Sequence, residues 1–258
     1  MKRFENKVVV VTGASRGIGQ AICAAFGGQG ATVVGIARSE LAGTASQVTT
    51  AGGRFIPCNA DFGRGGQSQA ANTVKDILKQ AGRVDALINN AGIIRRAPAV
   101  DFPEADWDEV LRVNLSAPFF LSQAVAKWWL AEGRAGFAPN ARLKIVNIAS
   151  LLSFQGGILV PAYTAAKSGL AGLTKALANE WAGERINVNA IAPGYISTEN
   201  TRPLREDPKR NQAILDRIPE GRWGWPEDIA GGCMFLASAD ADYVNGAIIV
   251  IDGGWLGR

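Results

Sequence analysis

The chain has 258 residues, of which 47% are hydrophobic and 19% are charged, and its formal net charge is +4. These values are typical of one ordinary globular domain, and the 27 scattered Lys and Arg residues, with no run longer than Arg95-Arg96, do not form the basic stripe of a nucleic-acid-binding protein. The sequence contains no histidine, which excludes Ser-His-Asp triads, His-Glu-x-x-His zinc sites and dehydrogenases that rely on a catalytic histidine.

The cysteines and the apolar runs exclude further classes of protein. Cys23, Cys58 and Cys233 lie far apart, are odd in number and form no C-x-x-C motif, so we expect small buried hydrophobic residues rather than disulfides or a metal site. The first apolar run, Val8 to Val11, is too short for a signal peptide, and no stretch approaches the ~20 apolar residues of a membrane span. We therefore expect a cytoplasmic protein with no membrane, nucleic-acid or metal partner.

Short apolar runs alternate with helical patterns along the whole chain. The expected strands are Val8–Thr12, Thr32–Ala37, Arg54–Asn59, Ala86–Asn90, Lys144–Ile148, Asn187–Ala192 and Ile248–Asp252. The expected helices are Gly17–Gln29, Ser39–Ala51, Gln67–Ala81, Phe102 to about Glu132, Tyr163–Ala182 and Pro226–Ala237. Strands that are apolar on both faces must be covered by helices on both sides. The pattern predicts an α/β fold over residues 1–258: a single-domain, Rossmann-like, doubly wound parallel sheet of about seven strands with helices on both faces.

Two segments are expected to be irregular. Residues 133–142 are rich in Gly, Pro and Asn and predict a surface loop. Residues 194–224 combine prolines, many charges and a short helical piece directly after a strand. Open α/β sheets bind ligands at the carboxyl ends of their strands, so we expect this second segment to act as a substrate lid.

A glycine-rich turn follows the first strand. Gly13, Gly17 and Gly19 join that strand to the first helix, where backbone without Cβ atoms lets a pyrophosphate approach the amide groups of the helix N-terminus. This context predicts dinucleotide binding. The second strand ends in Ala37-Arg38, where an acidic residue would favour NAD, and Arg16 adds a second cation. We expect NAD(P) as the cofactor and slightly favour NADP, although two exposed arginines could also be merely solvated.

A possible proton-transfer pair lies in the sequence Tyr-Thr-Ala-Ala-Lys. Tyr163 and Lys167 are four residues apart and therefore share one face of a helix. A nearby ammonium group lowers the pKa of a phenol, which would let tyrosine replace the missing histidine. Ser150 ends one expected strand and Asn89 to Gly92 end another, at the same edge of the sheet. Asn114 falls inside an expected helix, where Asn has poor propensity, so it is either exposed or part of a buried polar network.

These motifs together resemble the short-chain dehydrogenase/reductase family across essentially the whole chain. The matching features are T-G-x-x-x-G-x-G at 12–19, Asp61, N-N-A-G at 89–92, the set Asn114, Ser150, Tyr163 and Lys167, and P-G-Y-I-S-T at 193–198. The resemblance implies that Tyr163 transfers the proton, Ser150 hydrogen-bonds the substrate oxygen, Lys167 lowers the tyrosine pKa and holds the nicotinamide ribose, and Asn114 anchors a water relay. It also implies cofactor contacts by Gly13, Ser15, Arg16, Gly17, Ile18, Gly19, Arg38, Asp61, Asn89, Ala91, Gly92, Tyr163, Lys167, Pro193, Gly194, Ile196 and Thr198.

Within that family, several stretches resemble the members that act on deoxy sugar acids, among them Asn147 to Gly169 and Asn187 to Thr201. The resemblance implies hydride transfer between a nicotinamide cofactor and a secondary alcohol or ketone of such an acid, and a homotetramer. The residues suggest substrate contacts by Arg95, Gln155, Asn200 and Arg202, which could equally be solvated loop residues. The alternatives are a 3-oxoacyl-carrier-protein reductase or, from another class, a dinucleotide-binding protein without catalysis.

Overall fold

The computed structural model describes residues 2–258 and contains one seven-stranded parallel sheet, in the order β3-β2-β1-β4-β5-β6-β7. The strands are β1 (Val8–Thr12), β2 (Thr32–Ala37), β3 (Arg54–Asn59), β4 (Ala86–Asn89), β5 (Leu143–Ile148), β6 (Ile186–Pro193) and β7 (Ile248–Ile251). The predicted fold is confirmed, and every strand begins and ends within one residue of the expected position. The strand order reverses direction between β1 and β4, and open α/β sheets bind their ligands at such a point.

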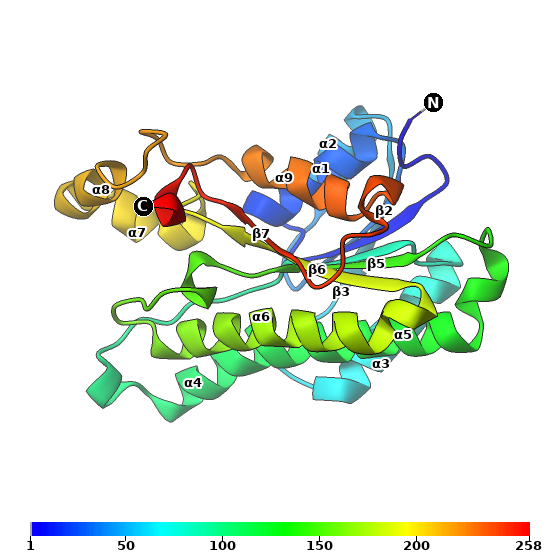
Figure 1. Ribbon diagram of the computed structural model, residues 1–258, viewed down its shortest axis with the longest axis horizontal. Helices are drawn as coiled ribbons and strands as arrows, with labels where there is room; N and C mark the ends of the chain where they lie inside the picture. Colours follow the sequence, from blue (N-terminus) through cyan, green and yellow to red (C-terminus); the bar gives the residue numbers. More distant parts are fainter. Residues whose placement is uncertain (1) are drawn as a thin grey trace.

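Helices cover both faces of the sheet (Figure 1). One face is covered by α1 (Gly17–Gly28), α2 (Ala42–Thr50) and α9 (Pro226–Leu236), and the other by α3 (Gly66–Ala81), α5 (Ala117–Ala131) and α6 (Pro161–Trp181). The short helices α4 (Glu104–Leu111), α7 (Arg202–Arg205) and α8 (Pro208–Leu215) lie toward the carboxyl edge of the sheet. Single turns are found at η1 (Ala99–Asp101), η2 (Arg112–Ser116), η3 (Gly133–Gly136), η4 (Leu151–Ser153), η5 (Ala182–Glu184), η6 (Glu199–Thr201), η7 (Ala239–Ala241) and η8 (Trp255–Gly257).

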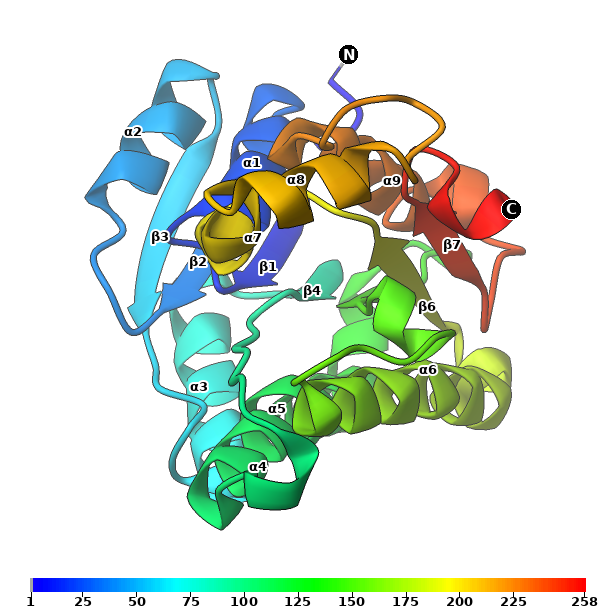
Figure 2. The same ribbon diagram turned by 90° about the vertical axis from the view of Figure 1, so that its left-hand side faces the viewer.

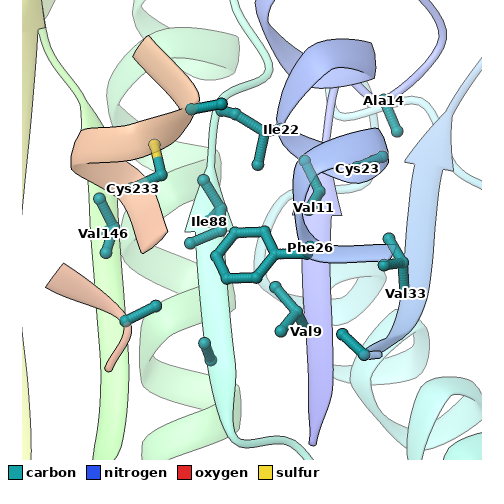
Figure 3. Packing of buried hydrophobic residues seen from close by; sticks show 14 of the residues in the cluster. Val9, Val11, Ala14, Ile22, Cys23, Phe26, Val33, Ile88, Val146 and Cys233 are labelled. Atoms are coloured by element: carbon teal, nitrogen blue, oxygen red, sulfur yellow. The ribbon is translucent and has the colours of Figure 1, made fainter. Parts of the chain in front are cut away.

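Each face of the sheet has its own apolar core. On the side of α1 and α9, Phe26 packs among Val9, Val11, Ile88 and the other residues drawn in Figure 3. The opposite core fills the space between the sheet and α3, α5 and α6. Every residue of β1 is buried, as the central strand of a sheet covered on both sides requires. The fully buried sheet therefore gives the loops at its carboxyl edge a rigid base.

The helix expected from Phe102 to about Glu132 is not continuous. It is divided into α4, a π-helical turn η2 over Arg112–Ser116, and α5. Pro118 has no N–H group and cannot donate to the carbonyl group of Asn114 four residues earlier, so an ordinary α-helical ladder cannot pass through this point. Single π-turns of this kind often lie at functional sites, and this one contains Asn114.

Three further segments differ in detail from expectation or add to it. The helix expected from Ser39 begins at Ala42. The expected surface loop 133–142 is anchored by Phe137, whose ring packs edge-on against Trp129 with 4.8 Å between the ring centroids. Residues 194–224 hold two short helices, α7 and α8, and one turn, η6. Among residues 2–258, no helix is long and apolar enough to cross a membrane.

Candidate active site

A cavity of about 300 Å³ opens at the carboxyl edge of the sheet, beside the point where the strand order reverses. The glycine loop, the ends of β2, β4, β5 and β6, and the first two turns of α6 form its walls. The sequence-predicted residues that line it are Gly13, Ser15, Arg16, Gly17, Ile18, Gly19, Arg38, Asp61, Ala91, Gly92, Ser150, Tyr163, Lys167, Pro193, Gly194, Ile196, Thr198 and Asn200. Residues far apart in the sequence thus meet around one space.

The glycine loop has a backbone conformation and a close approach of its own chain that residues with a side chain could not adopt. Gly13 and Gly17 have positive φ angles of 66° and 54°, which side chains rarely adopt. A Cβ atom added to Gly19 would lie 2.1 Å from the carbonyl oxygen of Gly13. The loop leads directly into α1, whose first N–H groups have no partner within the helix. Exposed amide groups, missing side chains and the positive end of a helix fit the pyrophosphate of a dinucleotide.

The N-N-A-G turn is fastened to the glycine loop by side chains. The hydroxyl of Thr12 accepts hydrogen bonds from the backbone N–H groups of Asn90 (3.0 Å) and Ala91 (2.9 Å). The side-chain amide of Asn90 donates to the carbonyl oxygens of Thr12 (2.9 Å) and Gly13 (3.2 Å). These bonds hold the ends of β1 and β4 together at the floor of the cavity.

Ser150, Tyr163 and Lys167 converge on the cavity from two elements. Ser150 follows β5, and its hydroxyl accepts a hydrogen bond from the N–H of Leu152 (3.2 Å) at the start of η4. Tyr163 and Lys167 lie one turn apart near the beginning of α6, with the Lys167 Nζ 5.6 Å from the centroid of the tyrosine ring. That ammonium group donates to the carbonyl oxygen of Ile148 at 2.6 Å. The two side chains therefore face the same cavity, as the sequence predicts.

The electrostatic balance at Tyr163 differs from the sequence expectation. Burial raises the pKa of Tyr163, while a hydrogen bond with Ser150 and the charge of Arg96 both lower it, and the net direction is upward. Burial also lowers the pKa of Lys167 from 10.5 to about 8. In the protein without cofactor the net shift of the tyrosine pKa is therefore upward, because loss of hydration outweighs the effects of Ser150 and Arg96. The lowering of this pKa by Lys167 beside a bound cofactor stays a prediction.

Asn114 lies behind the cavity wall and is fully buried. Its side-chain amide donates to the carbonyl oxygens of Val110 (2.8 Å) and Ile93 (2.9 Å), and its Oδ1 accepts from the N–H of Ile93 (3.3 Å). A Cβ atom on Gly92 would lie 2.7 Å from Asn114 Oδ1 and 3.8 Å from Lys167 Nζ. The asparagine thus fixes the backbone that separates it from Lys167, and the π-turn supplies its position.

The far end of the cavity carries two free cations. Arg16 and Arg38 are exposed and line the cavity, and neither forms an ion pair within residues 2–258. A hydrogen bond between the hydroxyls of Ser39 and Ser15 (3.0 Å) ties the end of β2 to the glycine loop. Asp61 lies at the wall beside Ala60 and Phe62. In the same described range, no group of three or more acidic or cysteine side chains is arranged to hold a metal ion.

Known proteins share this architecture and much of this sequence. Residues 13–256 match the family model described as enoyl-(acyl carrier protein) reductase. The 2-dehydro-3-deoxy-D-gluconate 5-dehydrogenases of Escherichia coli and Bacillus subtilis are both 50% identical to the chain, covering 99% of it and 97% and 96% of their own lengths. The crystal structure of a candidate 2-deoxy-D-gluconate 3-dehydrogenase from Agrobacterium tumefaciens with bound NADP is 55% identical, covers 98% of both chains and superposes with a TM-score of 0.89.

The chain belongs to the short-chain dehydrogenase/reductase family. The family resemblance drawn from the motifs is confirmed, including the likeness to members that act on deoxy sugar acids, and with it the assignment as an oxidoreductase.

One residue that was predicted to contact the cofactor, Asn89, lies outside the cavity. Asn89 does not line the cavity, because its side chain points to the opposite face of the sheet, as Leu87 does. There its amide donates to Asn147 (2.9 Å) and to Ser122 of α5 (3.1 Å). Side chains alternate between the faces of a strand, so Asn90 takes the position toward the cavity. That alternation was readable in the sequence and would have selected Asn90.

The four predicted substrate residues separate into one that lines the cavity and three that do not. Asn200 lines it. Arg95 is paired with Glu109 (2.7 Å) and Asp106 (3.4 Å). Gln155 accepts a hydrogen bond from the indole N–H of Trp255 (3.2 Å). Arg202 lies among Glu199 and Glu206. Sequence reasoning thus chose two arginines that already have acidic partners. The partners of Arg95 lie 11 and 14 positions away along the chain and are not evident before the fold is known. Those of Arg202 lie three and four positions away, a helical spacing that the sequence already contains.

Proposed function

We propose that the protein is an NADP-dependent dehydrogenase of deoxy sugar acids, which interconverts a secondary alcohol and a ketone. The observation that carries the proposal is the 50% identity, over almost the whole chain, to two dehydrogenases of 2-dehydro-3-deoxy-D-gluconate. The cavity supports it, since Ser150, Tyr163 and Lys167 stand beside a glycine loop shaped for a dinucleotide. The substrate would bind between Tyr163 and residues 198–201.

The residues divide the proton chemistry among themselves. In the oxidation, Ser150 hydrogen-bonds the substrate hydroxyl and Tyr163, as phenolate, takes its proton, while the hydrogen on the same carbon departs as hydride and a ketone forms. The bound cofactor would supply the hydride acceptor at its nicotinamide ring. Lys167, protonated below its pKa of about 8, would stabilise the phenolate and hold the nicotinamide ribose. Asn114 would anchor the water relay through which the proton leaves. Burial raises the tyrosine pKa, so the positive charge of an oxidised nicotinamide would add to the cations that oppose it.

The preference for NADP follows from the two free cations at the adenosine end. Arg16 and Arg38 line the cavity, and we expect them to hold a 2′-phosphate, since guanidinium groups bind phosphate through paired, charge-assisted hydrogen bonds. The Agrobacterium tumefaciens relative at 55% identity was crystallised with NADP. Asp61 would contact the adenine, and Ile196 and Thr198 the nicotinamide amide.

We also propose that residues 194–224 form a lid over the substrate. Thr198 to Thr201 line the cavity, and the segment is held at its base by hydrogen bonds between Gly224 and its neighbours Tyr195 (2.9 Å) and Ser197 (2.8 Å). The two short helices also pack on a small apolar cluster of Ile214, Ile218, Trp223, Leu151 and Trp255, and we expect them to move over it as one body. The homotetramer and the cytoplasmic location stay predictions, and the first is checked by light scattering on the purified protein.

The function is tested by initial rates with 2-deoxy-D-gluconate and 2-dehydro-3-deoxy-D-gluconate, each with NAD and NADP. A 3-oxoacyl-carrier-protein substrate belongs in the same series, because the matching family model is described by acyl-carrier-protein chemistry. We expect kcat/KM for one sugar acid to exceed that for the 3-oxoacyl substrate by about 100-fold or more, which corresponds to about 3 kcal/mol. Faster turnover of the 3-oxoacyl substrate would contradict the proposal.

The cofactor preference is tested by Arg38→Gln. Loss of a charge-assisted contact to phosphate should raise KM for NADP about tenfold, or about 1.4 kcal/mol, and leave KM for NAD nearly unchanged. Arg54→Gln, an exposed arginine on β3 that does not line the cavity, is the matched control. Equal effects of Arg38→Gln on both cofactors would overturn the preference for NADP.

A further inference from the structure

Two arginines that have no carboxylate partner within residues 2–258 lie near the substrate end of the cavity, although neither is among the residues that line it. Arg96 lies on the connection from β4 to α4, three residues beyond Ile93 in the cavity wall, and its guanidinium donates to the carbonyl oxygen of Asn200 (3.0 Å). Arg210 lies on α8. Within residues 2–258, neither side chain has a carboxylate oxygen within 4.0 Å, unlike the neighbouring Arg95 and Arg202, which each contact two acidic residues.

The two arginines belong to different segments of the fold. The connection that carries Arg96 leaves the end of β4, whereas α8 belongs to the segment between β6 and α9. Figure 2 shows α7 and α8 on one side of the end of β4 and the descending connection to α4 on the other. A charged group held by both arginines would therefore link the rigid sheet edge to the proposed lid.

Charges at this end of the cavity are close enough to act on one another. Partial burial lowers the pKa of Arg96, the Tyr163 hydroxyl raises it, and the charge of Arg210 lowers it. Arg96 in turn lowers the pKa of Tyr163, and Arg210 lowers that of Tyr195. Two like charges that repel each other without a counter-ion make a site for an anion.

We propose that Arg96 and Arg210 together bind the carboxylate of the substrate, with the reacting carbon directed to Tyr163. This inference rests on the sugar-acid function proposed above. A carboxylate suits two guanidinium groups, since its oxygens accept several charge-assisted N–H hydrogen bonds. Its arrival replaces the repulsion between Arg96 and Arg210 by attraction to both, and so draws α8 toward the sheet edge. The two arginines thus determine specificity for acids and couple substrate binding to closure of the lid.

Kinetics with a charged and an uncharged substrate test the inference. The variants are Arg96→Gln and Arg210→Gln, with Arg95→Gln and Arg202→Gln as matched controls whose charge is already compensated. The substrates are 2-deoxy-D-gluconate and its amide, in which the carboxylate is replaced by a neutral group of similar shape. We expect each test variant to raise KM for the acid tenfold or more and KM for the amide less than threefold, with KM for NADP unchanged. The control variants should stay within threefold for both substrates.

Direct binding provides a readout that is independent of turnover. Calorimetric titration of 2-deoxy-D-gluconate into NADP-saturated Tyr163→Phe should show binding, and addition of Arg96→Gln or Arg210→Gln to that variant should weaken it tenfold or more. Suppose that the wild-type enzyme oxidises the acid and that both arginine variants keep its KM and its affinity for the acid. That result would overturn the carboxylate site and leave the proposed function standing. A wild-type protein that oxidises neither sugar acid would overturn the function and this inference with it.

Discussion

Two buried lysines at opposite ends of β5 have opposite surroundings. Lys144, at the start of the strand, is 4% exposed, and its ammonium group contacts Asp242 (2.5 Å) and the side-chain oxygen of Asn187 (3.2 Å). Lys167 on α6 is 3% exposed and donates to the last residue of the same strand, the carbonyl oxygen of Ile148 (2.6 Å). The first lysine has a carboxylate partner, and the second has none within residues 2–258.

The same difference distinguishes the two edges of the sheet: charges at the amino edge stabilise the fold, and charges at the carboxyl edge are available to a ligand. At the amino edge, buried charges are compensated, as Asp85 is by Lys7 (3.2 Å) and Arg83 (2.8 Å). At the carboxyl edge, Lys167, Arg96 and Arg38 keep their charge available to groups that are not part of the chain. Of these three, only Lys167 is buried. A buried charge without a partner is costly, so its presence in a folded protein points to a ligand or a reaction.

The largest expected effect comes from Tyr163→Phe, which removes the proton-transferring hydroxyl and leaves the rest of the carboxyl edge in place. General acid–base catalysis contributes about 10²–10⁴-fold, so kcat should fall by about 1,000-fold or more. The dissociation constant of NADP, measured by fluorescence titration, should change less than threefold because the glycine loop is untouched. Turnover within tenfold of wild type would refute the role of Tyr163.

The two lysines can be compared directly through Lys167→Met and Lys144→Met. We expect Lys167→Met to lower kcat about 100-fold, since the phenolate of Tyr163 loses the ammonium group 5.6 Å from the centroid of its ring and the burial of the phenol still raises its pKa. Lys144→Met should leave kcat per folded molecule within twofold. Similar losses in both variants would contradict the division between the two edges.

The same pair sharpens the comparison through the pH dependence of stability. In the folded protein the pKa of Lys167 is about 8 instead of 10.5, so below pH 8 its charged burial costs about 3 kcal/mol. Above pH 8 the unfolded chain binds the proton more tightly, and stability rises with pH up to about 10.5. Lys167→Met should therefore be more stable than wild type at pH 7, and the gap should shrink by about 2 kcal/mol by pH 9.5. Urea unfolding of the cofactor-free proteins measures this, and a constant gap would refute it.

Much of the carboxyl edge was predictable because its parts are local in the sequence. The glycine loop, the Tyr163–Lys167 spacing and the ends of apolar strands are each contained in a few residues, and parallel strands bring them to one edge. The fold followed from the same alternation of strands and helices. Asn90 was missed by a single position, where the alternation along β4 decides which asparagine faces the cavity.

The remaining features depend on contacts between distant segments. Arg95 and Arg96 are adjacent and chemically identical, and only the fold shows that Asp106 and Glu109 compensate the first and not the second. The π-turn at Asn114 depends on Pro118, and the direction of the Tyr163 pKa depends on how completely α6 and its neighbours exclude water. The extent of burial and the net effect of the surrounding charges cannot be read from a single sequence.

The smallest expected effect tests the amino edge. Asp242→Asn removes the carboxylate beside Lys144 and leaves a buried ammonium group without an opposite charge, a change that costs several kcal/mol when both partners are buried. Because the Asp242 side chain is 42% exposed, water offsets part of this cost, and we expect a loss of about 1–2 kcal/mol in the free energy of unfolding.

Asp240→Asn is the matched control two residues away: its ion pair with Arg3 lies at the surface, where such pairs contribute about 0–1 kcal/mol. Calorimetric melting at one protein concentration should show a lower Tm for Asp242→Asn than for Asp240→Asn, with kcat of both unchanged. If the two variants melt together, the amino edge does not owe its stability to compensated buried charge, and the contrast between Lys144 and Lys167 would then concern catalysis alone.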